Sequence, residues 1–256
     1  MEQSLADRAP SLKLYYVEVS HPANAARLML DYKGLAYRRV DIRPGFQLIV
    51  TRVHRFKDIT VPALTIDGER VQGSIAIAQA LERLEPDPPL YPQDPGLRAA
   101  VEEAEAWGER ELQPVPRHLY RWALISKPEL LEPFVAEHQR LRPAGPIAKA
   151  QRPGLTRFMR AHGVTDERVR SDMQALPGML ERVRGLLDAG VLGGERPNAA
   201  DFQIATSLRA IEGLDDLRPL VDARLDDYAR SIWPDTEIRL PAVLPPDWAP
   251  VPPVQA

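Results

Sequence analysis

The stretch that decides the fold is VPALTIDGERVQGSIAI, residues 61–77. Its first residues alternate as a short strand, Asp67-Gly68 is a strong signal for a hairpin turn, and residues 69–72 return as a second strand. Gly73-Ser74 then opens a helix over residues 75–84, in which apolar residues recur at helical spacing. The stretch therefore predicts a ββα unit.

A βαβ unit precedes this stretch. Residues 12–17, LKLYYV, are short and β-prone, and residues 37–42 have the pattern of a second strand. Between them we expect a helix that begins at Pro22, whose missing N–H is not needed in a first turn, and stops at Gly34. Residues 43–60 mix apolar and basic residues and are expected to hold a short helix within a loop.

A change of composition divides the chain into parts. Residues 85–95 contain five prolines, whose fixed φ angles forbid a helix and indicate a stiff linker. Beyond them the sequence has long helical patterns, over residues 96–113, 115–125, 128–141, 166–189 and 199–214. Six prolines lie from residue 240 onward, so we expect a tail that is extended along the surface or disordered. The predicted parts are residues 1–86, a linker at 87–94, a helical domain at 95–239 and the tail at 240–256.

Composition excludes several classes of protein. Apolar residues make up 44% and charged residues 27% of the 256 positions, as in an ordinary globular protein. The net charge of −3 gives no electrostatic reason to expect nucleic acid as a partner. No apolar run approaches the roughly 20 residues of a membrane helix, and residues 1–10 lack the apolar core of a secretion signal. We therefore expect a cytoplasmic protein with no membrane partner.

The absence of cysteine restricts the chemistry further. It rules out a disulfide framework, a thiolate metal site, a cysteine nucleophile and a redox CxxC pair. The five histidines show no pairing of the HExxH kind, so no metal site is predicted. Any sulfur chemistry requires a thiol that arrives with a ligand.

The motifs of residues 61–77, with Leu90-Tyr91-Pro92 after them, resemble the second half of a glutathione transferase N-terminal domain. Residues 192–202, LGGERPNAADF, are similar to the capping-box helix of that family, with Asn198 and Asp201 as the box. From the order and spacing of these motifs, the chain is identified as a member of the cytosolic glutathione S-transferase superfamily. The resemblance implies an α/β thioredoxin-like N-terminal domain (βαβ-ββα, a mixed four-stranded sheet) and an all-α helical-bundle C-terminal domain. It also implies a homodimer that uses glutathione, or a related low-molecular-weight thiol, as cosubstrate, with no tightly bound cofactor.

Ser20 is the candidate catalytic residue. Ser20-His21-Pro22 resembles the Ser-x-Pro run of the theta, zeta and phi classes, in which the serine donates to the thiolate. A thiol with a pKa of about 8.5 is mostly protonated at neutral pH, and lowering that pKa by one unit takes about 1.4 kcal/mol. A hydroxyl donor and a helix N-terminus aimed at the sulfur would supply it. The alternatives are an N-cap without a ligand for Ser20, and Tyr16 as the donor. Tyr16 is otherwise an aromatic of the strand or core, and His21 either modulates the site or faces solvent.

The resemblance also assigns residues that hold the thiol peptide. A cis Val61-Pro62 bond would let the backbone of Val61 pair with the cysteinyl part of the peptide, and the alternative is a trans proline at a strand start. Ser74 would hold the γ-glutamyl carboxylate at a helix N-terminus, or it caps that helix. The family usually has Glu or Gln where Gly73 stands, and Gln72 is the candidate replacement.

The second-substrate site is predicted at Gln113, Arg117 and Arg121, where the helical domain would border the first domain. The alternative for the two arginines is a solvated face paired with Glu109 or Glu111. These residues together predict a transferase that adds a thiol peptide to an electrophilic small molecule. The rivals are a non-catalytic binding or scaffold protein on the same fold, and a thiol-dependent isomerase or dehalogenase.

Overall fold

The computed structural model describes residues 10–236 and 238–249. Its sheet has four strands in the order β2-β1-β3-β4. Strand β1 runs parallel to β2 and antiparallel to β3, and β3 pairs antiparallel with β4, which confirms the predicted mixed sheet. The strands are β1 Leu12–Tyr16, β2 Tyr37–Asp41, β3 Ala63–Ile66 and β4 Glu69–Gln72.

The turn between β3 and β4 lies within residues 61–77, the stretch from which the fold was predicted. Ile66 pairs with Glu69, which leaves Asp67 and Gly68 as a two-residue loop, and both have positive φ angles, of 50° and 92°. Asp and Gly adopt these angles readily, and a two-residue turn with both φ values positive matches the twist of the strands it joins. The hairpin predicted from the sequence is confirmed.

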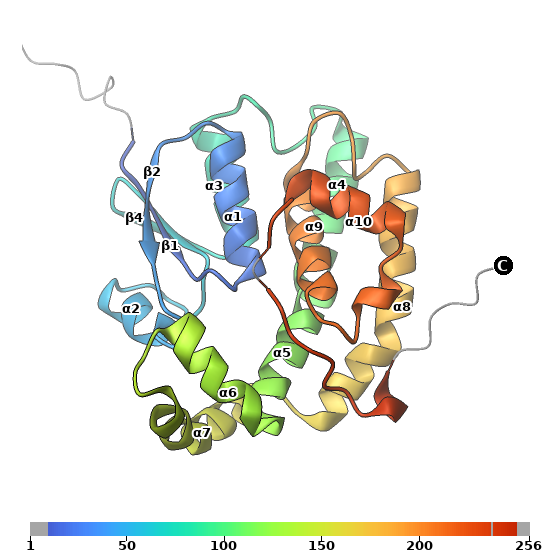
Figure 1. Ribbon diagram of the computed structural model, residues 1–256. Coiled ribbons are helices and arrows are strands. Elements are labelled where there is room, and N and C mark those ends of the chain that lie inside the picture. The colour runs from blue at the N-terminus through green and yellow to red at the C-terminus, as the bar shows by residue number, and fades with distance from the viewer. Residues whose placement is uncertain (1–9, 237, 250–256) are drawn as a thin grey trace, which may run out of the picture.

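Three helices complete the N-terminal domain: α1 His21–Tyr32, α2 Gln47–Val53 and α3 Ser74–Leu84. Helices α1 and α3 contact each other and lie on one side of the sheet, whereas α2 is the short helix expected between residues 43 and 60 (Figure 1). The apolar residues of α1 that face the core, such as Met29 and Leu30, are fully buried. This arrangement leaves the N-termini of α1 and α3 to face the helical domain.

The helical domain follows the proline-rich segment. Its first helix, α4, begins at Pro95, and a π-helical turn, η2 Gly108–Leu112, leads from it into α5. A second π-helical turn, η3 Val135–Gln139, follows α6. The helices are α4 Pro95–Trp107, α5 Pro114–Ser126, α6 Pro128–Phe134, α7 Ala144–Ala161, α8 Asp166–Asp188, α9 Ala199–Glu212 and α10 Ala223–Ile232, with 3₁₀ turns η4 Arg218–Leu220 and η5 Pro246–Trp248.

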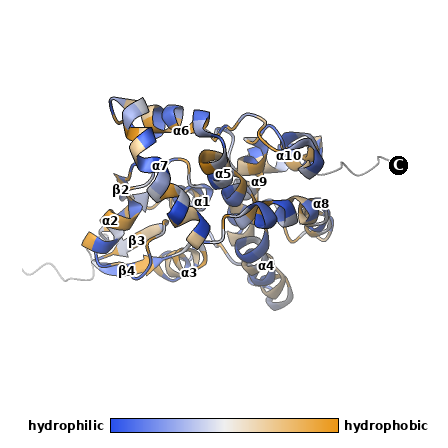
Figure 2. Cartoon of the chain, turned by 90° about the horizontal axis from the view of Figure 1, so that it is seen from below, coloured by the Kyte–Doolittle hydropathy of each residue, from blue (hydrophilic) through white to orange (hydrophobic). Residues whose placement is uncertain are grey.

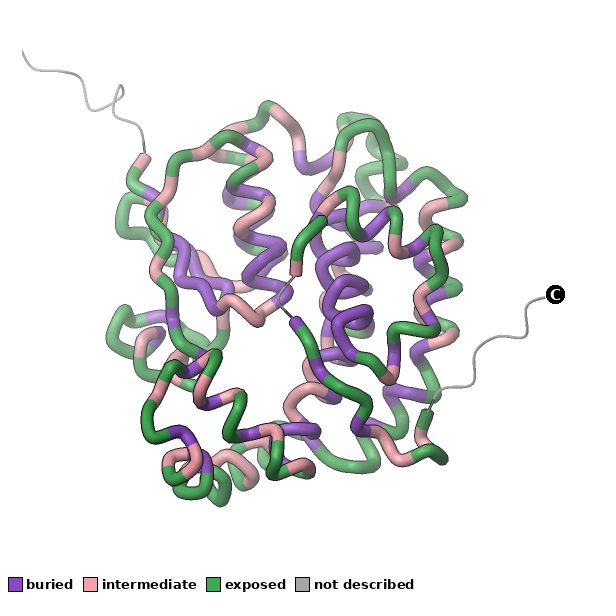
Figure 3. The backbone as a smooth tube through the Cα atoms, viewed as in Figure 1, coloured by how far each residue is buried: buried purple, intermediate pink, exposed green. Residues whose placement is uncertain are grey.

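Helix α9 is buried along its whole length and joins the two domains (Figure 3). Its N-terminus carries the predicted capping box, in which Asn198 accepts from the Asp201 N–H and Asp201 accepts from the Asn198 N–H. The Asp201 carboxylate also accepts from the Tyr228 hydroxyl of α10 at 2.9 Å. Since α9 contacts α1, α4 and α10, one helix fixes the position of the N-terminal domain against the bundle.

Helices α6 and α7 extend the bundle toward the sheet. Seen from below, they lie between α5 and the part of the N-terminal domain that carries β2 and α2 (Figure 2). Two contacts join them to the N-terminal domain. A Cβ added at Gly45 would lie 3.0 Å from Nε2 of Gln139, and Arg140 lies 3.9 Å from the Glu18 carboxylate.

The tail is partly ordered against the bundle. Leu240 donates its N–H to the Gly213 carbonyl, and the N–H groups of Val243 and Leu244 donate to the Asp216 carboxylate. Trp248 packs against Trp122, with ring centroids 5.4 Å apart. The segment to residue 249 packs against the bundle, with Leu240 and Val243 buried, and residues 250–256 of the predicted tail lie outside the described part. Within the described residues, no helix has the length and apolar character needed to cross a bilayer.

Candidate active site

Ser20 is the N-cap of α1. Its Oγ accepts a long hydrogen bond, 3.4 Å, from the N–H of Ala23, and its carbonyl accepts from the N–H of Asn24. Within the described chain the Ser20 hydroxyl donates to no other group, so its proton is available to a ligand. The side chain is partly exposed. The geometry combines the N-cap with a free hydroxyl donor at a helix N-terminus, so the two interpretations of Ser20 are compatible.

His21 does not face solvent, and that interpretation is wrong. Its ring is 4% exposed, and Nε2 lies 3.2 Å from the carbonyl oxygen of Gln113, at the start of α5. Burial, and next the positive charge of Arg117, lower the pKa of His21 to about 3, against the opposing effect of the Gln113 carbonyl. The ring is therefore neutral at physiological pH and acts as a contact between the domains.

The Val61-Pro62 peptide bond is cis, as the sequence analysis favoured. Pro62 accepts from the Gly73 N–H at 3.0 Å, whereas the N–H and carbonyl of Val61 pair with no described residue. An extended peptide could form hydrogen bonds with these two free groups, which lie just before β3.

The side-chain amide of Gln72 forms hydrogen bonds with the loop before Val61. Its Oε1 accepts from the N–H of Asp58 at 2.8 Å, and its Nε2 donates to the carbonyls of Asp58 and Thr60 at 2.7 and 2.8 Å. Both kinds of bonding atom are occupied, so a direct contact with a ligand would have to replace these bonds. Gln72 holds the loop that leads into the Val61-Pro62 bond.

Ser74 is buried at the first position of α3, and the cap is Gly73, with a φ angle of 96° that glycine adopts without strain. The interpretation of Ser74 as the capping residue is therefore wrong. Its hydroxyl donates instead to Oε1 of Glu109, 3.3 Å away in η2. A carboxylate of the helical domain thus lies beside the predicted anion site.

The three residues predicted for the second substrate lie together on the helical side. The backbone carbonyl of Gln113 accepts a hydrogen bond from Nε2 of His21. The side-chain oxygen of Gln113 accepts from Nε2 of Gln203 in α9 at 2.6 Å. Arg117 and Arg121 follow on α5, both partly buried, and their charges reach His21.

The two arginines are not on a solvated face, so that alternative is wrong. Burial lowers the pKa of Arg117, with Glu109 opposing it, and burial and then Arg117 lower the pKa of Arg121 to about 10. These guanidinium groups are partly desolvated and would bind an anionic group strongly.

Tyr16, the other candidate donor, directs its hydroxyl to Oδ1 of Asn24 at 2.8 Å. Burial is the largest cause that raises the pKa of this phenol. Asn24 in turn donates to the carbonyls of Glu18 and Ser20, so Tyr16 supports the loop that carries Ser20.

Glu109 and Gln203 were not predicted as site residues. A signal for Glu109 exists, because Glu109, Gln113, Arg117 and Arg121 recur at intervals of four, which places residues on one helical face. Gln203 had no such signal, since only the fold brings α9 beneath α5. Within the described chain, no group of three or more His, Asp or Glu residues could hold a metal ion.

Comparison with known proteins gives the same architecture. Residues 14–89 match the family model described as glutathione S-transferase, N-terminal domain. The maleylacetoacetate isomerase of Mus musculus is 39% identical over 79 residues, which is 29% of this chain. The chain spans about a third of that relative's length, 37%.

Two solved structures extend the likeness to the helical domain. A glutathione S-transferase from Rhodospirillum rubrum F11 has a TM-score of 0.56 and 21% identity, covering 93% of this chain and 98% of its own. The theta class glutathione S-transferase of Xanthomonas axonopodis pv. citri, with glutathione bound, has a TM-score of 0.55 and 19% identity, covering 78% and 82%. The chain has a thioredoxin-like domain followed by a helical domain. Residues 14–89 match that family's N-terminal domain, and the helical domain shares the fold of these two solved structures.

Proposed function

We propose that this protein is a glutathione-dependent enzyme that activates the bound thiol for attack on an electrophilic small molecule. The observation that carries the proposal is the free Ser20 hydroxyl proton at the N-terminus of α1. A hydroxyl donor and the partial positive charge of a helix N-terminus both favour the thiolate over the thiol. The thiolate then forms a carbon–sulfur bond, and either a leaving group departs or the adduct takes a proton.

The peptide is oriented by two further groups in this proposal. The free N–H and carbonyl of Val61 pair with its cysteinyl residue, and Ser74 with the first N–H groups of α3 holds the γ-glutamyl carboxylate. Glu109, 3.3 Å from the Ser74 hydroxyl, is placed to accept the α-ammonium group next to that carboxylate. It would take the role of the side chain that Gly73 lacks.

Gln113, Arg117 and Arg121 form the second-substrate side of the proposed site. Arg117 and Arg121 are partly buried cations on one helix, so the electrophile that they favour carries a negative charge. Because the His21 ring is neutral, it adds no positive charge to those of Arg117 and Arg121.

The test compares the pKa of bound glutathione in three proteins, measured from the ultraviolet absorbance of the thiolate. Ser20→Ala removes cap and donor, and we expect conjugation to fall by at least tenfold and the thiol pKa to rise by about one unit. Thr165→Ala is the matched control, because Thr165 caps α8 in the same way, far along the chain. An unchanged thiol pKa in Ser20→Ala would reject the proposal.

The second candidate is a glutathione-dependent isomerase, favoured by the 39% identity to a maleylacetoacetate isomerase in the N-terminal domain. An isomerase adds the thiolate and later expels it, so glutathione is not consumed. Measuring free thiol during turnover of an anionic, conjugated substrate separates the two reactions: a transferase depletes it, an isomerase does not.

We also propose a cytoplasmic homodimer: the location rests on the sequence composition, and the dimer rests on the family resemblance alone. Sedimentation equilibrium tests the dimer against the monomer mass of 28.7 kDa. A single species of that mass across a wide concentration range would exclude it.

A further inference from the structure

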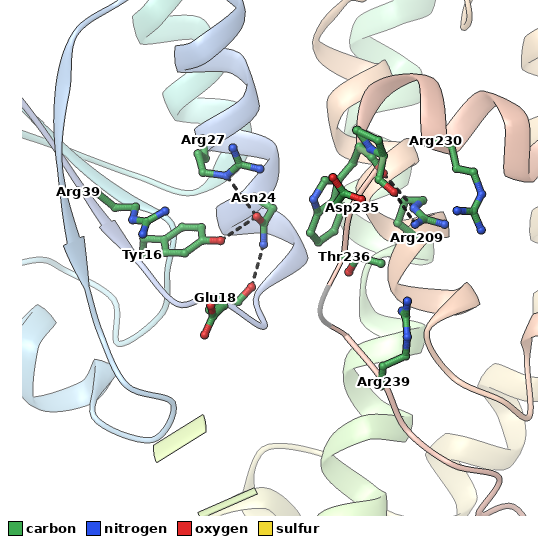
Figure 4. Close-up of a pocket in the computed structure, with 12 residues that line it drawn as sticks. Tyr16, Glu18, Asn24, Arg27, Arg39, Arg209, Arg230, Asp235, Thr236 and Arg239 are labelled. Atoms are coloured by element: carbon green, nitrogen blue, oxygen red, sulfur yellow. Dashed lines mark hydrogen bonds between the residues drawn. The ribbon is translucent and has the colours of Figure 1, made fainter. Parts of the chain in front are cut away.

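A pocket of about 380 Å³ lies outside the proposed thiol site. It opens between the N-terminal domain, where β1, β2 and α1 form one wall, and the helical domain, where α9, α10 and the segment after α10 form the other (Figure 4). None of Ser20, Val61, Ser74 and Gln113 lines it.

The pocket is rich in arginine. Among the described residues, its lining includes five guanidinium groups and two carboxylates, Glu18 and Asp235, an excess of three positive charges. The whole chain carries a net charge of −3, so the pocket concentrates charge of the opposite sign. The arginines are Arg27, Arg39, Arg209, Arg230 and Arg239.

The arginines come from both domains. Arg27 and Arg39 lie on one wall, and Arg209, Arg230 and Arg239 lie on the other, as Figure 4 shows. A ligand that touches both walls would therefore connect the N-terminal domain to α9, α10 and the segment that follows α10.

Arg209 holds the second wall in place. It is 3% exposed, its Nε donates to the Trp233 carbonyl at 2.9 Å, and its Nη2 donates to the Pro234 carbonyl at 3.0 Å. It also pairs with Glu212, so its charge is largely satisfied within the protein. Arg209 is a structural part of the pocket.

Arg230 pairs with Asp226 of α10, whereas the other three arginines are available to a ligand. Arg239 forms no ion pair with a described residue and donates only to the carbonyl of its neighbour Ile238. Arg27 and Arg39 pair with Asp31 and Asp41 in partly or fully exposed ion pairs. Exposed pairs contribute roughly 0–1 kcal/mol, so an anion in the pocket can compete for these guanidinium groups.

A second pocket of about 370 Å³ shares Arg209, Arg230 and Arg239 with the first. It adds Arg218 together with the carboxylates Glu212 and Asp226, so it adds no excess of positive charge. In the first pocket Arg27 and Arg39 lie on one wall and Arg239 on the other, which fits a ligand with more than one anionic group.

We propose that this pocket binds a small molecule that carries two or more negative charges as phosphate or carboxylate groups. Guanidinium groups recognise both through paired, charge-assisted hydrogen bonds. The ring of Tyr16, with the Arg39 guanidinium 5.2 Å from its centroid, forms part of the lining. Because Tyr16 bonds Asn24 and Asn24 bonds the Ser20 carbonyl, the ligand would lie two hydrogen bonds from the proposed thiol site.

The test is calorimetric titration of the full chain with inorganic pyrophosphate and, separately, with citrate, at matched ionic strength set with sodium chloride. We expect saturable binding of at least one, and the tighter of the two names the anionic group. Arg239→Gln should weaken that binding about tenfold or more, the usual cost of losing a hydrogen bond to a charged group. The double variant Arg27→Gln with Arg39→Gln should do the same from the other wall.

Arg98→Gln is the matched control, because it removes an exposed arginine of α4 and leaves the pocket intact. Absence of saturable binding of both anions, or equal weakening in the control, would overturn the proposal. Glutathione binding, measured in the same variants, is expected to persist, so failure here is distinguishable from failure of the proposed enzymatic function.

Discussion

His21 illustrates how a single residue can depend on the whole fold. It occupies the first turn of α1, next to the candidate donor, and its buried ring contacts the carbonyl of Gln113, 92 positions away in the chain. Nothing in the local sequence distinguishes it from a histidine that faces water. The Ser20-His21-Pro22 motif could be recognised from three neighbouring residues, whereas the neutral state of the His21 ring could not be predicted from them.

We expect His21 to stay neutral throughout the physiological range. Its pKa of about 3 in the folded protein lies below the ordinary 6.5, so the unfolded chain binds the proton more readily and His21 lowers stability as pH falls below 6.5. NMR spectra of the ring protons, with the signal assigned by its loss in His21→Gln, should show no His21 titration between pH 5 and 8. A midpoint near 6.5 for that signal would contradict the buried placement.

Glu105 gives a pH dependence of the opposite sign. It is 2% exposed in α4 and accepts from the Tyr91 hydroxyl, and burial is the main cause that raises its pKa from 4.5 to about 7. Between these values the folded protein binds more protons than the unfolded chain, so the contribution of Glu105 to stability falls as pH rises. Relative to wild type, Glu105→Gln should gain stability from pH 4.5 to 7, by at most about 1.4 kcal/mol per pH unit.

Urea unfolding of both proteins at several pH values measures this difference. The paired comparison is needed because burial also raises the pKa of Glu212 to about 7, and that group remains in both proteins. Glu129→Gln, at an exposed position of α6, is the control and should leave the difference flat. A flat difference for Glu105→Gln as well would mean that the carboxylate is hydrated.

At the scale of elements, two glycines differ in whether the surrounding structure leaves room for a side chain. A Cβ at Gly213, which ends α9, would lie 2.3 Å from the carbonyl oxygen of Ile238, a backbone atom that cannot rotate away. At Gly185, inside α8, a Cβ would meet nothing within 4 Å.

We therefore predict opposite effects for two identical substitutions. Gly213→Ala should destabilise the protein by about 1–3 kcal/mol, the usual effect of overpacking. The new methyl group would force the backbone of residues 238–240, which lies against Gly213, to move. Gly185→Ala should stabilise it by about 0.5–1 kcal/mol, since alanine restricts the unfolded chain and suits a helix. Denaturant midpoints measure both, and a shift of the same sign in the two variants would be inconsistent with the packing at Gly213.

Most elements could be predicted, and the exceptions have physical reasons. Helix α7 was not predicted, because Gly145, Pro146, Pro153 and Gly154 all argue against a helix and only packing against α5 and α6 outweighs them. Helix α10 also had no prediction, although Asp222 caps it. In the N-terminal domain, by contrast, turn residues and periodicity agree with the fold at each step, from Asp67-Gly68 to α3.

At the scale of the whole molecule, the two domains share one core. Leu14 of β1, fully buried, and Leu208 of α9 belong to the same apolar cluster, and α9 contacts both α1 and α10. All four tryptophans lie from residue 107 onward, after the N-terminal domain, although Trp233 packs against Leu28 of α1. A change made in the sheet and seen in tryptophan fluorescence must have passed through the shared core.

We predict that Leu14→Ala lowers the free energy of unfolding by about 2–5 kcal/mol, the usual loss for a buried leucine, and that tryptophan fluorescence reports the full loss. Leu48→Ala, on the exposed side of α2 at 42% exposure, is the control and should leave the transition in place. Urea unfolding followed by fluorescence and by far-ultraviolet circular dichroism should give coincident curves in all three proteins. If Leu14→Ala shifts only the circular dichroism curve, the domains unfold separately, and α9 does not couple them as its burial implies.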